Sequence, residues 1–199
     1  MAIDVLSTNF EKHTNKNLLQ KILINNFYAN LLRIARPLKP VNILDAGCGE
    51  GITLDKLIKN NIGKKLEGIE NSEVAIELSK KVNPHLNIKY GSVYSLPYKD
   101  ASFDLVICTE VLEHLDDPEK GLDELSRVSS KHLLLTVPNE PWFTFQRILR
   151  GKNIFHLGAH PEHVNHWTSN SFKKFLKKNG LKIKKTKLPF AWTMILTEK

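Results

Sequence analysis

The feature that most constrains this chain is an alternation of short β-rich runs with amphipathic helical segments along most of its 199 residues. The runs contain apolar and β-branched residues, which is typical of strands. The runs cover residues 41–45, 65–70, 88–90, 103–109 and 132–137. A helix between two strands returns the chain to the same end of a sheet, so such strands run parallel with helices on both faces. We therefore expect an α/β fold with a doubly wound, mostly parallel sheet.

Helix start signals support this order. Ser72 and Asp117 are placed to cap the helices that follow the second and the fourth strand, and Pro118 suits the first turn of the latter. The expected apolar faces are Val74, Ala75, Leu78 and Val82 in the first of these helices, and Leu122, Leu125 and Val128 in the second.

Both ends of the chain add further elements. Residues 15–36 favour a helix that ends at Pro37 and Pro40, with an apolar stripe made of Leu18, Leu19, Ile22, Leu23, Phe27 and Leu31. A last helix, capped by Thr168 or Ser169, carries Phe172, Phe175 and Leu176 and stops at residues 179–180. Residues 181–188 and 193–197 are expected to pair as antiparallel strands at the sheet edge.

The charge of the chain is uneven. The formal net charge is +8, and much of it comes from lysines near the C-terminus. Such a surface can attract nucleic acid or anionic lipid. Lysine also suits the solvated face of a helix and an edge strand, where it discourages aggregation, and this interpretation is favoured. The lysines are Lys173, Lys174, Lys177, Lys178, Lys182, Lys184, Lys185 and Lys187.

Several classes of protein are excluded by composition. Cys48 and Cys108 are too few and too far apart for a disulfide framework or a zinc motif, and their apolar contexts predict buried free thiols. We find no apolar run long enough to span a bilayer, and the N-terminus lacks the features of a signal peptide. The expectation is a soluble cytoplasmic protein.

A glycine-rich loop follows the first strand. Residues 45–51 read Asp-Ala-Gly-Cys-Gly-Glu-Gly, and glycines let a backbone turn tightly and approach a ligand closely. Ligands of a doubly wound sheet bind outside the carboxyl ends of the strands, where this loop lies. The spacing is G-x-G-x-G, whereas a dinucleotide fold prefers G-x-G-x-x-G, which disfavours a nicotinamide dehydrogenase. Glu70 closes the second strand, where a carboxylate can accept hydrogen bonds from ribose hydroxyls.

These segments resemble the motifs of the class I S-adenosylmethionine-dependent methyltransferases. ILDAGCGEG (residues 43–51) resembles their first motif, and LEGIENSEVAIELSKK (residues 66–81) resembles their second strand and helix. GSVYSLPYKDASFDLVICTEVLEHLDDP (residues 91–118) resembles the block from the adenine contact to the fourth strand. The resemblance covers about residues 40 to 140 and implies a Rossmann-like fold with one antiparallel edge strand.

The resemblance also implies a cofactor site by position. Asp45, Gly47 and Gly49 would surround the amino-acid portion of S-adenosylmethionine, and Glu70 would hold its ribose. The adenine would lie beside Asn71, Ser92 and Val93, and Thr109 would line the cofactor at the end of the fourth strand. Many relatives carry Asp where Ser92 stands, so this contact is expected to be weaker because a hydroxyl lacks the charge.

An acidic cluster with a histidine follows the fourth strand. If residues 110–114 are helical, Glu110, Glu113 and His114 share one face and can chelate a divalent metal, with His163 as the fourth ligand. This resembles the small-RNA 2′-O-methyltransferases and the ubiquinone-pathway O-methyltransferases, in which a metal would hold vicinal hydroxyls. The alternatives are a loop-stabilising or substrate-contacting role without metal, or His114 or His163 as general base.

We expect a single methyltransferase domain over residues 1–199, with four parts. We expect an N-terminal helical lid (1–40), a cofactor-binding core (41–138), a substrate-side insertion (139–167), and a terminal helix with edge strands (168–199). Within the insertion, residues 141–150 are aromatic and basic, and are interpreted as a lid, a wall for a planar acceptor, a base-stacking platform or a packing helix.

The leading hypothesis is a methyltransferase that acts on an oxygen atom of a small-molecule acceptor. An RNA 2′-O-methyltransferase is the second hypothesis, favoured by the lysines and the metal-like residues and disfavoured by the absence of a separate RNA-binding domain. A non-catalytic S-adenosylmethionine-binding partner subunit is the third, and the intact glycine loop disfavours it. The acceptor and the oligomeric state are left open.

Overall fold

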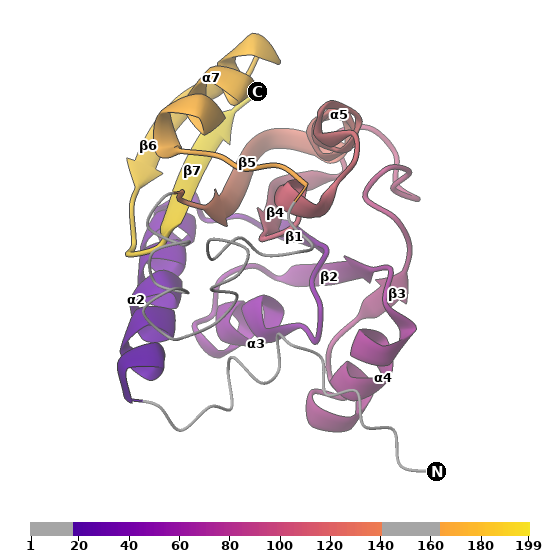
Figure 1. Cartoon of the computed structure of the whole chain (residues 1–199). Helices are drawn as coiled ribbons and strands as arrows, with labels where there is room; N and C mark the ends of the chain where they lie inside the picture. The colour runs from indigo at the N-terminus through magenta and orange to yellow at the C-terminus, as the bar shows by residue number, and fades with distance from the viewer. Residues whose placement is uncertain (1–17, 141–163) are drawn as a thin grey trace.

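A computed structural model describes residues 18–140 and 164–199 of the chain (Figure 1). Seven strands form one sheet in the order β3-β2-β1-β4-β5-β7-β6. The strands are β1 (Asn42–Ala46), β2 (Lys65–Glu70), β3 (Ile88–Tyr90), β4 (Phe103–Thr109), β5 (Ser129–Pro138), β6 (Lys182–Lys187) and β7 (Trp192–Glu198). The helices are α2 (Leu18–Ala35), α3 (Ile52–Lys59), α4 (Glu73–Val82), α5 (Pro118–Val128) and α7 (Ser169–Lys178), with short 3₁₀ turns η1 (Arg36–Leu38) and η2 (Leu112–His114).

The sheet is parallel except for its terminal pair. β1 pairs in parallel with both β2 and β4, while β7 pairs antiparallel with β5 and with β6. The predicted doubly wound, mostly parallel sheet with an antiparallel edge unit is therefore confirmed. The chain leaves β1 toward β3 and then crosses back to β4, so the strand order reverses between β1 and β4. Ligands of such sheets bind at this reversal, outside the carboxyl ends of the strands.

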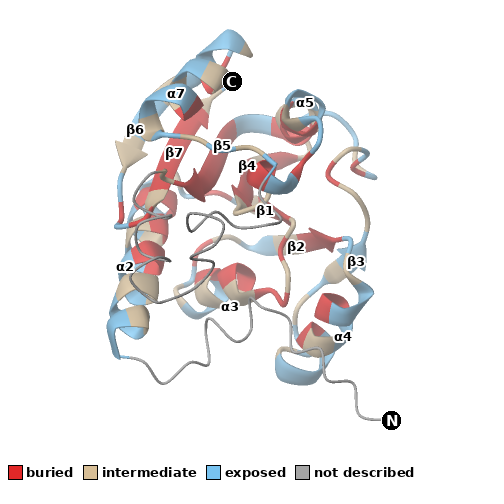
Figure 2. Ribbon diagram, in the orientation of Figure 1, coloured by how far each residue is buried: buried red, intermediate tan, exposed pale blue. Residues whose placement is uncertain are grey.

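The core has two apolar layers, one on each face of the sheet (Figure 2). Successive residues of β4 alternate between them: Val106 and Cys108 belong to one layer, and Leu105 and Ile107 to the other. This follows from the period of two in a strand. α5 and α7 cover the first layer, and α2 and α3 cover the second. Helices therefore lie on both faces, as expected.

The predicted helix caps are confirmed. The Ser72 hydroxyl accepts from the backbone N–H of Ala75 at 3.2 Å, and the Asp117 carboxylate accepts from that of Lys120 at 3.0 Å. Of the two candidates for the last helix, Thr168 is the cap. Each cap satisfies a backbone donor that the first helical turn leaves without an intrahelical partner.

Two predicted helix faces are partly wrong. In α2 the N-terminal members of the stripe, Leu18, Leu19 and Ile22, are exposed, and burial begins at Phe27. The α2 residues that pack in the apolar layer of the sheet begin at Ile24, so the first turns of the helix lie outside this layer. In α4 the buried residues are Ala75, Ile76 and Ser79, whereas Val74 and Val82 are each 42% exposed. β3 has only three residues, so the sheet offers little surface to α4. The buried face of α4 is therefore narrower than its apolar residues suggest.

Among residues 18–140 and 164–199, no helix combines the length and the apolar character that crossing a bilayer requires. The two cysteines are free and buried in this part of the chain, as predicted. Burial raises the pKa of both thiols, so Cys48 and Cys108 stay protonated and are not placed to act as nucleophiles.

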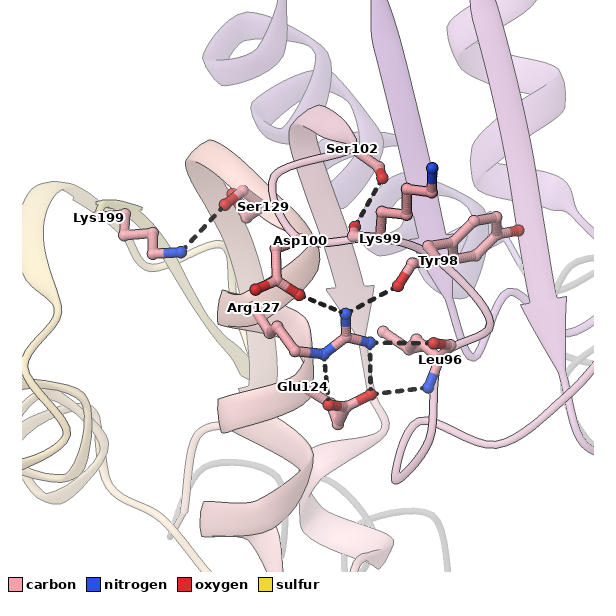
Figure 3. A network of polar contacts seen from close by, with 9 residues as sticks. All are labelled: Leu96, Tyr98, Lys99, Asp100, Ser102, Glu124, Arg127, Ser129 and Lys199. Carbon is pink, nitrogen blue, oxygen red and sulfur yellow. Dashed lines mark hydrogen bonds and ion pairs between the residues drawn. The ribbon is translucent and has the colours of Figure 1, made fainter.

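An arginine clamp holds the segment that follows β3 (Figure 3). The guanidinium of Arg127, near the end of α5, donates to the backbone carbonyls of Leu96 and Tyr98 at 3.0 and 2.7 Å. It also forms two hydrogen bonds with Glu124, at 2.7 and 2.9 Å, and one with Asp100 at 2.8 Å. The planar fork of donors makes Arg, rather than Lys, suited to this task. The clamp fixes the loop that leads from residues 92–93 into β4.

We predict that Arg127→Ala lowers the free energy of unfolding by about 2 kcal/mol, because two carbonyls and two carboxylates lose a shared donor. Urea denaturation followed by circular dichroism measures this. Lys99→Ala, in the same loop but using only its backbone carbonyl, is the control and is expected to change stability by less than about 0.5 kcal/mol. Equal stability of Arg127→Ala and the wild type would show that the clamp is not stabilising.

Candidate functional site

The glycine loop lies at the carboxyl end of β1, at the reversal in strand order. Its three glycines all have left-handed backbone conformations. At Gly47, with φ of 74°, a Cβ atom would lie 2.4 Å from Cγ2 of Val111, which follows β4. A side chain at this position is therefore excluded twice, by the backbone angle and by a close neighbour.

The backbone donors of this loop are used within the protein. The N–H groups of Gly47 and Cys48 both donate to the carbonyl of Ile69, at 2.8 and 3.1 Å. The N–H of Gly51 donates to the carbonyl of Cys48 at 2.9 Å. A phosphate-binding loop needs such groups to point at the ligand. This loop therefore lacks the main feature of a pyrophosphate cradle, which agrees with the G-x-G-x-G spacing.

Glu70 links the glycine loop to the loop after β2. Its Oε2 accepts from the N–H of Gly49 at 2.7 Å, and its Oε1 accepts from the N–H groups of Asn71 and Ser72, both at 2.9 Å. The side chain is 8% exposed. Each carboxylate oxygen can accept more than one hydrogen bond, so Glu70 keeps capacity for a ligand hydroxyl.

Asp45, the penultimate residue of β1, lies in an unfavourable electrostatic environment. It is fully buried, and neither carboxylate oxygen has a hydrogen-bond partner among residues 18–140 and 164–199. Burial, together with the charge of Glu70, raises the pKa of Asp45 to about 8. An ionised carboxylate without partners is costly to bury, so this side chain favours either a proton or a cation nearby.

Further carboxylates gather at the same edge. Glu50, which the sequence analysis did not assign, is 1% exposed and lies inside the glycine loop. The charges of Asp45, Glu110 and Glu50 each raise the pKa of Tyr28 of α2, after the larger effect of burial. These three carboxylates therefore lie close enough to Tyr28 to act on it. The edge is strongly negative, which suits a cationic ligand and opposes an anionic one.

The other predicted cofactor residues lie on the neighbouring loops. Asn71 is exposed and directly follows Glu70, while Val93 is buried. The Ser92 hydroxyl accepts from the N–H of Tyr94 at 3.2 Å, so part of its capacity is used in its own turn. Thr109 is half-buried at the end of β4. The fold thus places these positions at the carboxyl edge, and direct contact links Gly49 to Glu70.

The predicted helical face of residues 110–114 is wrong. Glu110 has a φ of 58°, a left-handed conformation that no α-helix contains, and only residues 112–114 form a 3₁₀ turn. Glu113 is 1% exposed and His114 is exposed, so the two point into different environments. Within residues 18–140 and 164–199, no group of three His, Cys, Asp or Glu side chains is placed to hold a metal. His163 lies outside the described residues.

Glu110 has a different environment from the one predicted. Its Oε2 accepts from the indole N–H of Trp192 on β7 at 2.7 Å, and its Oε1 accepts from the Thr136 hydroxyl on β5 at 3.3 Å. A non-glycine residue in the left-handed region is held there by its surroundings, and such strain often marks functional positions. Glu110 is thus a fixed carboxylate between the ends of β4, β5 and β7.

Aromatic side chains line this edge beside Glu110. Phe27 of α2 packs edge-on against both Trp192 and Tyr28, with ring centroids 5.2 Å apart in each pair. No sequence spacing relates Phe27 to Trp192, so this contact was not predicted. We call Phe27, Tyr28 and Trp192 the aromatic wall. The N-terminal helix therefore contributes to the site and packs on the sheet.

Residues 164–167 brace the turn that follows β4. The side-chain amide of Asn165 donates to the carbonyls of Leu115 and Leu112, at 2.6 and 3.3 Å. The N–H groups of Val164 and Asn165 both donate to the backbone carbonyl of Glu113. Nδ1 of His166 lies 3.8 Å from Oε1 of Glu140. The aromatic and basic residues 141–150 lie outside the described part of the chain.

Comparison with known proteins gives one family. Residues 16–186 match a family described as a methyltransferase domain. A norajmaline N-methyltransferase of Rauvolfia serpentina is 35% identical over 98 residues, which are 46% of this chain and 33% of that protein. A ubiquinone biosynthesis O-methyltransferase of Coxiella burnetii (strain Dugway 5J108-111) is 25% identical over 177 residues, covering 80% of this chain and 74% of that protein.

The fold has solved counterparts as well. The crystal structure of a magnesium protoporphyrin IX methyltransferase from Synechocystis PCC 6803 with bound SAH has a TM-score of 0.68 and 19% identity, covering 98% of this chain and 96% of that one. At 19% identity, this similarity shows a shared fold and does not show a shared activity. The chain spans less than half the length of several of the curated relatives that it matches.

We predict that Asp45→Asn stabilises the protein at high pH. The folded pKa of about 8 lies above the value near 4 of an unfolded Asp, so the wild type loses stability as pH rises between these values. The amide cannot ionise, so the variant is expected to be more stable by about 1 kcal/mol or more at pH 8.5, with the difference shrinking toward pH 4. Urea denaturation across this range measures it. Asp123→Asn on α5, where the carboxylate is exposed, is the control; a destabilised Asp45→Asn at pH 8.5 would contradict the assignment.

Proposed function

The chain belongs to the S-adenosylmethionine-dependent methyltransferases, and we propose that it transfers the methyl group of this cofactor to an oxygen atom of a small-molecule acceptor. The observation that carries this proposal is the buried carboxylate of Asp45, which lies near the charge of Glu70. S-adenosylmethionine carries a sulfonium and an ammonium group, so a negative edge complements it. An anionic dinucleotide would be repelled there.

We assign the cofactor contacts by position. Asp45, Gly47 and Gly49 would surround the amino-acid portion, and a nearby cation would favour the ionised form of Asp45. Glu70 would accept hydrogen bonds from the ribose hydroxyls through the capacity that its three backbone contacts leave.

The neighbouring loops would hold the rest of the cofactor. Asn71, Ser92 and Val93 would flank the adenine, and Thr109 would line the cofactor at the end of β4. When bound, S-adenosylmethionine supplies the electrophilic methyl group, and the protein orients the acceptor in line with it.

The choice of oxygen rests on the extent of similarity. The ubiquinone biosynthesis O-methyltransferase aligns with 80% of this chain. The norajmaline N-methyltransferase aligns with 46% of it. Acceptor recognition depends on the parts that lie outside the glycine loop, so the longer alignment is the more informative one. We therefore propose a hydroxyl acceptor, with nitrogen as the alternative.

A hydroxyl acceptor must lose a proton as its oxygen is methylated. Two groups near the end of β4 can receive it, namely the carboxylate of Glu110 and the imidazole of His114. Glu110 is oriented by Trp192 and Thr136, and Trp192, the half-buried member of the aromatic wall, would pack against a planar or apolar acceptor. We place the acceptor against this wall, with its hydroxyl at Glu110. His163 keeps its predicted role as an alternative base.

The residues that the structure describes do not fit the predicted metal site. Glu110 is turned toward β5 and β7, Glu113 is buried, and His114 faces solvent. Among residues 18–140 and 164–199, no three His, Cys, Asp or Glu side chains are grouped so that they could hold an ion. We therefore derive no step from a metal.

We predict that Glu70→Gln weakens cofactor binding by more than tenfold, because the amide loses the charge and one of the two acceptor oxygens. Isothermal titration calorimetry with S-adenosylhomocysteine measures the dissociation constant. Glu77→Gln, an exposed position on α4, is the matched control and is expected to bind like the wild type. Thermal denaturation confirms that both variants fold. No measurable affinity of the wild type for S-adenosylmethionine or S-adenosylhomocysteine would contradict the proposed function.

We further predict that methyl transfer is insensitive to chelators. A screen with S-adenosylmethionine labelled in its methyl group, run against catechols, other small phenols, amines and total RNA, identifies the acceptor class. Activity on a phenolic acceptor is expected to change by less than twofold on addition of 5 mM EDTA, because the described residues offer no metal site. Loss of activity that returns with a divalent ion would restore the metal mechanism, and label found only in RNA would overturn the small-molecule assignment.

A further inference from the structure

The net positive charge of the protein comes from its C-terminal part. Residues 164–199 contain nine of the 29 Lys and Arg residues but one of the 21 Asp and Glu residues. This segment alone therefore has the formal charge of +8, and the remaining 163 residues are neutral overall. Such segregation is a charge asymmetry, which is informative about partners and not about fold.

The lysines lie on two neighbouring elements, α7 and β6, which stand at one end of the sheet, away from β3 and α4 (Figure 1). Two of them form ion pairs, Lys178 with Glu119 and Lys184 with Glu198. The structure shows no ion pair to residues 18–140 or 164–199 for the other six: Lys173, Lys174, Lys177, Lys182, Lys185 and Lys187. We call these six residues the lysine face.

Three residues of the lysine face, Lys173, Lys177 and Lys182, line an open hollow between α7 and β6. Its volume is about 410 Å³, and its lining is Lys173, Lys177, Leu181, Lys182, Ile183 and Thr186. Three ammonium groups thus surround a floor with apolar members. Like charges placed together repel one another, so the arrangement is stabilised by an anionic partner.

Exposed apolar side chains follow the lysine face directly. The turn between β6 and β7 carries Leu188, which is 56% exposed, and Phe190, which is 47% exposed. Lysine next to exposed Leu and Phe is the composition of surfaces that lie in the interface of a membrane. Residues 164–199 contain no arginine, although arginine is the residue best matched to bidentate contacts with nucleic-acid phosphates and bases.

We propose that the lysine face and the turn at Leu188 and Phe190 dock the protein on the surface of an anionic lipid bilayer. The lysines would bind lipid phosphates, each contributing through the negative surface potential, and the two apolar side chains would enter the interface. This surface is distinct from the glycine loop and does not depend on which acceptor is methylated.

The docking surface would bring the site to the bilayer. β6 ends at Lys187, and β7 begins at Trp192, which pairs with Pro138 at the end of β5. The turn at Leu188 and Phe190 therefore lies at the same edge of the sheet as the glycine loop and Glu110. Strand spacing places β6 about 14 Å from β4, three strands away. An acceptor that is dissolved in lipid would then have a short path to the aromatic wall.

Co-sedimentation of the full chain with vesicles tests the docking surface. Wild-type protein is expected to bind vesicles with half phosphatidylglycerol and half phosphatidylcholine at 50 mM NaCl, and to bind phosphatidylcholine vesicles at least tenfold less. The variant Lys177→Gln/Lys182→Gln/Lys185→Gln/Lys187→Gln is expected to lose about 100-fold or more in partitioning, since four surface charges are removed. Leu188→Ser/Phe190→Ser is expected to lose about tenfold even at 300 mM NaCl.

The matched control removes four lysines elsewhere. Lys64→Gln/Lys65→Gln/Lys80→Gln/Lys81→Gln changes the net charge equally at exposed positions on β2, the loop before it and α4, and is expected to bind anionic vesicles within about threefold of the wild type. Equal loss in both quadruple variants would show a net-charge effect and overturn the proposal. Absence of wild-type binding to anionic vesicles would overturn it too. The proposal would also be overturned if the quadruple lysine variant lost the gel shift of a 20-nucleotide RNA but kept its binding to vesicles. Calorimetry with S-adenosylhomocysteine keeps this outcome separate from the cofactor assignment.

Discussion

The carboxylate of Glu70 is the contact on which the rest of the site depends. It accepts the N–H of Gly49 from one loop and those of Asn71 and Ser72 from the next, so one side chain sets the distance between the ends of β1 and β2. The hydrogen bond to Glu70 occupies the N–H of Gly49, which would otherwise be available to an anion. It also leaves a second carboxylate, Asp45, buried beside a fixed negative charge. The chemistry of the edge, negative and short of free donors, follows from this arrangement.

The second half of the site is built by elements that are distant in sequence. Glu110 follows β4, Trp192 begins β7, and Phe27 belongs to α2, yet they meet because β5 separates β4 from β7 by a single strand. The reversal of direction in β7 is what brings Trp192 to the carboxyl edge, since a parallel strand would place its first residue at the opposite end. The antiparallel unit therefore extends the sheet and also completes the site.

The parts of the fold that were predictable are those set by local chemistry. The bounds of β2, β3 and β4 and the caps Ser72 and Asp117 agree with the sequence patterns, because period, capping and turn preferences act over a few residues. Glu70 was predictable because its place at a strand end follows from the fold class. The left-handed conformation of Glu110 was not, since contacts 26 and 82 residues away with Thr136 and Trp192 hold it. The exposed N-terminal half of α2 was missed for the same reason, because an apolar stripe does not show how much of it the sheet covers.

The two halves of the site differ in how they use burial. At the donor half, Asp45 and Glu70 are removed from water by the strands, and the resulting rise in the pKa of Asp45 means that the folded protein is held in a state that a cation would relieve. At the acceptor half, Glu110 is only half-buried and its oxygens are satisfied by Trp192 and Thr136, so it is oriented without being strongly destabilised. With the proposed assignment of Asp45 to the methyl donor and Glu110 to the acceptor, binding of the donor would relieve an electrostatic cost of folding, whereas the acceptor would be held by contacts that it makes itself. This difference in burial between the two halves agrees with a fold that keeps one cofactor while its acceptors differ, because only the donor half is formed by buried residues of the sheet.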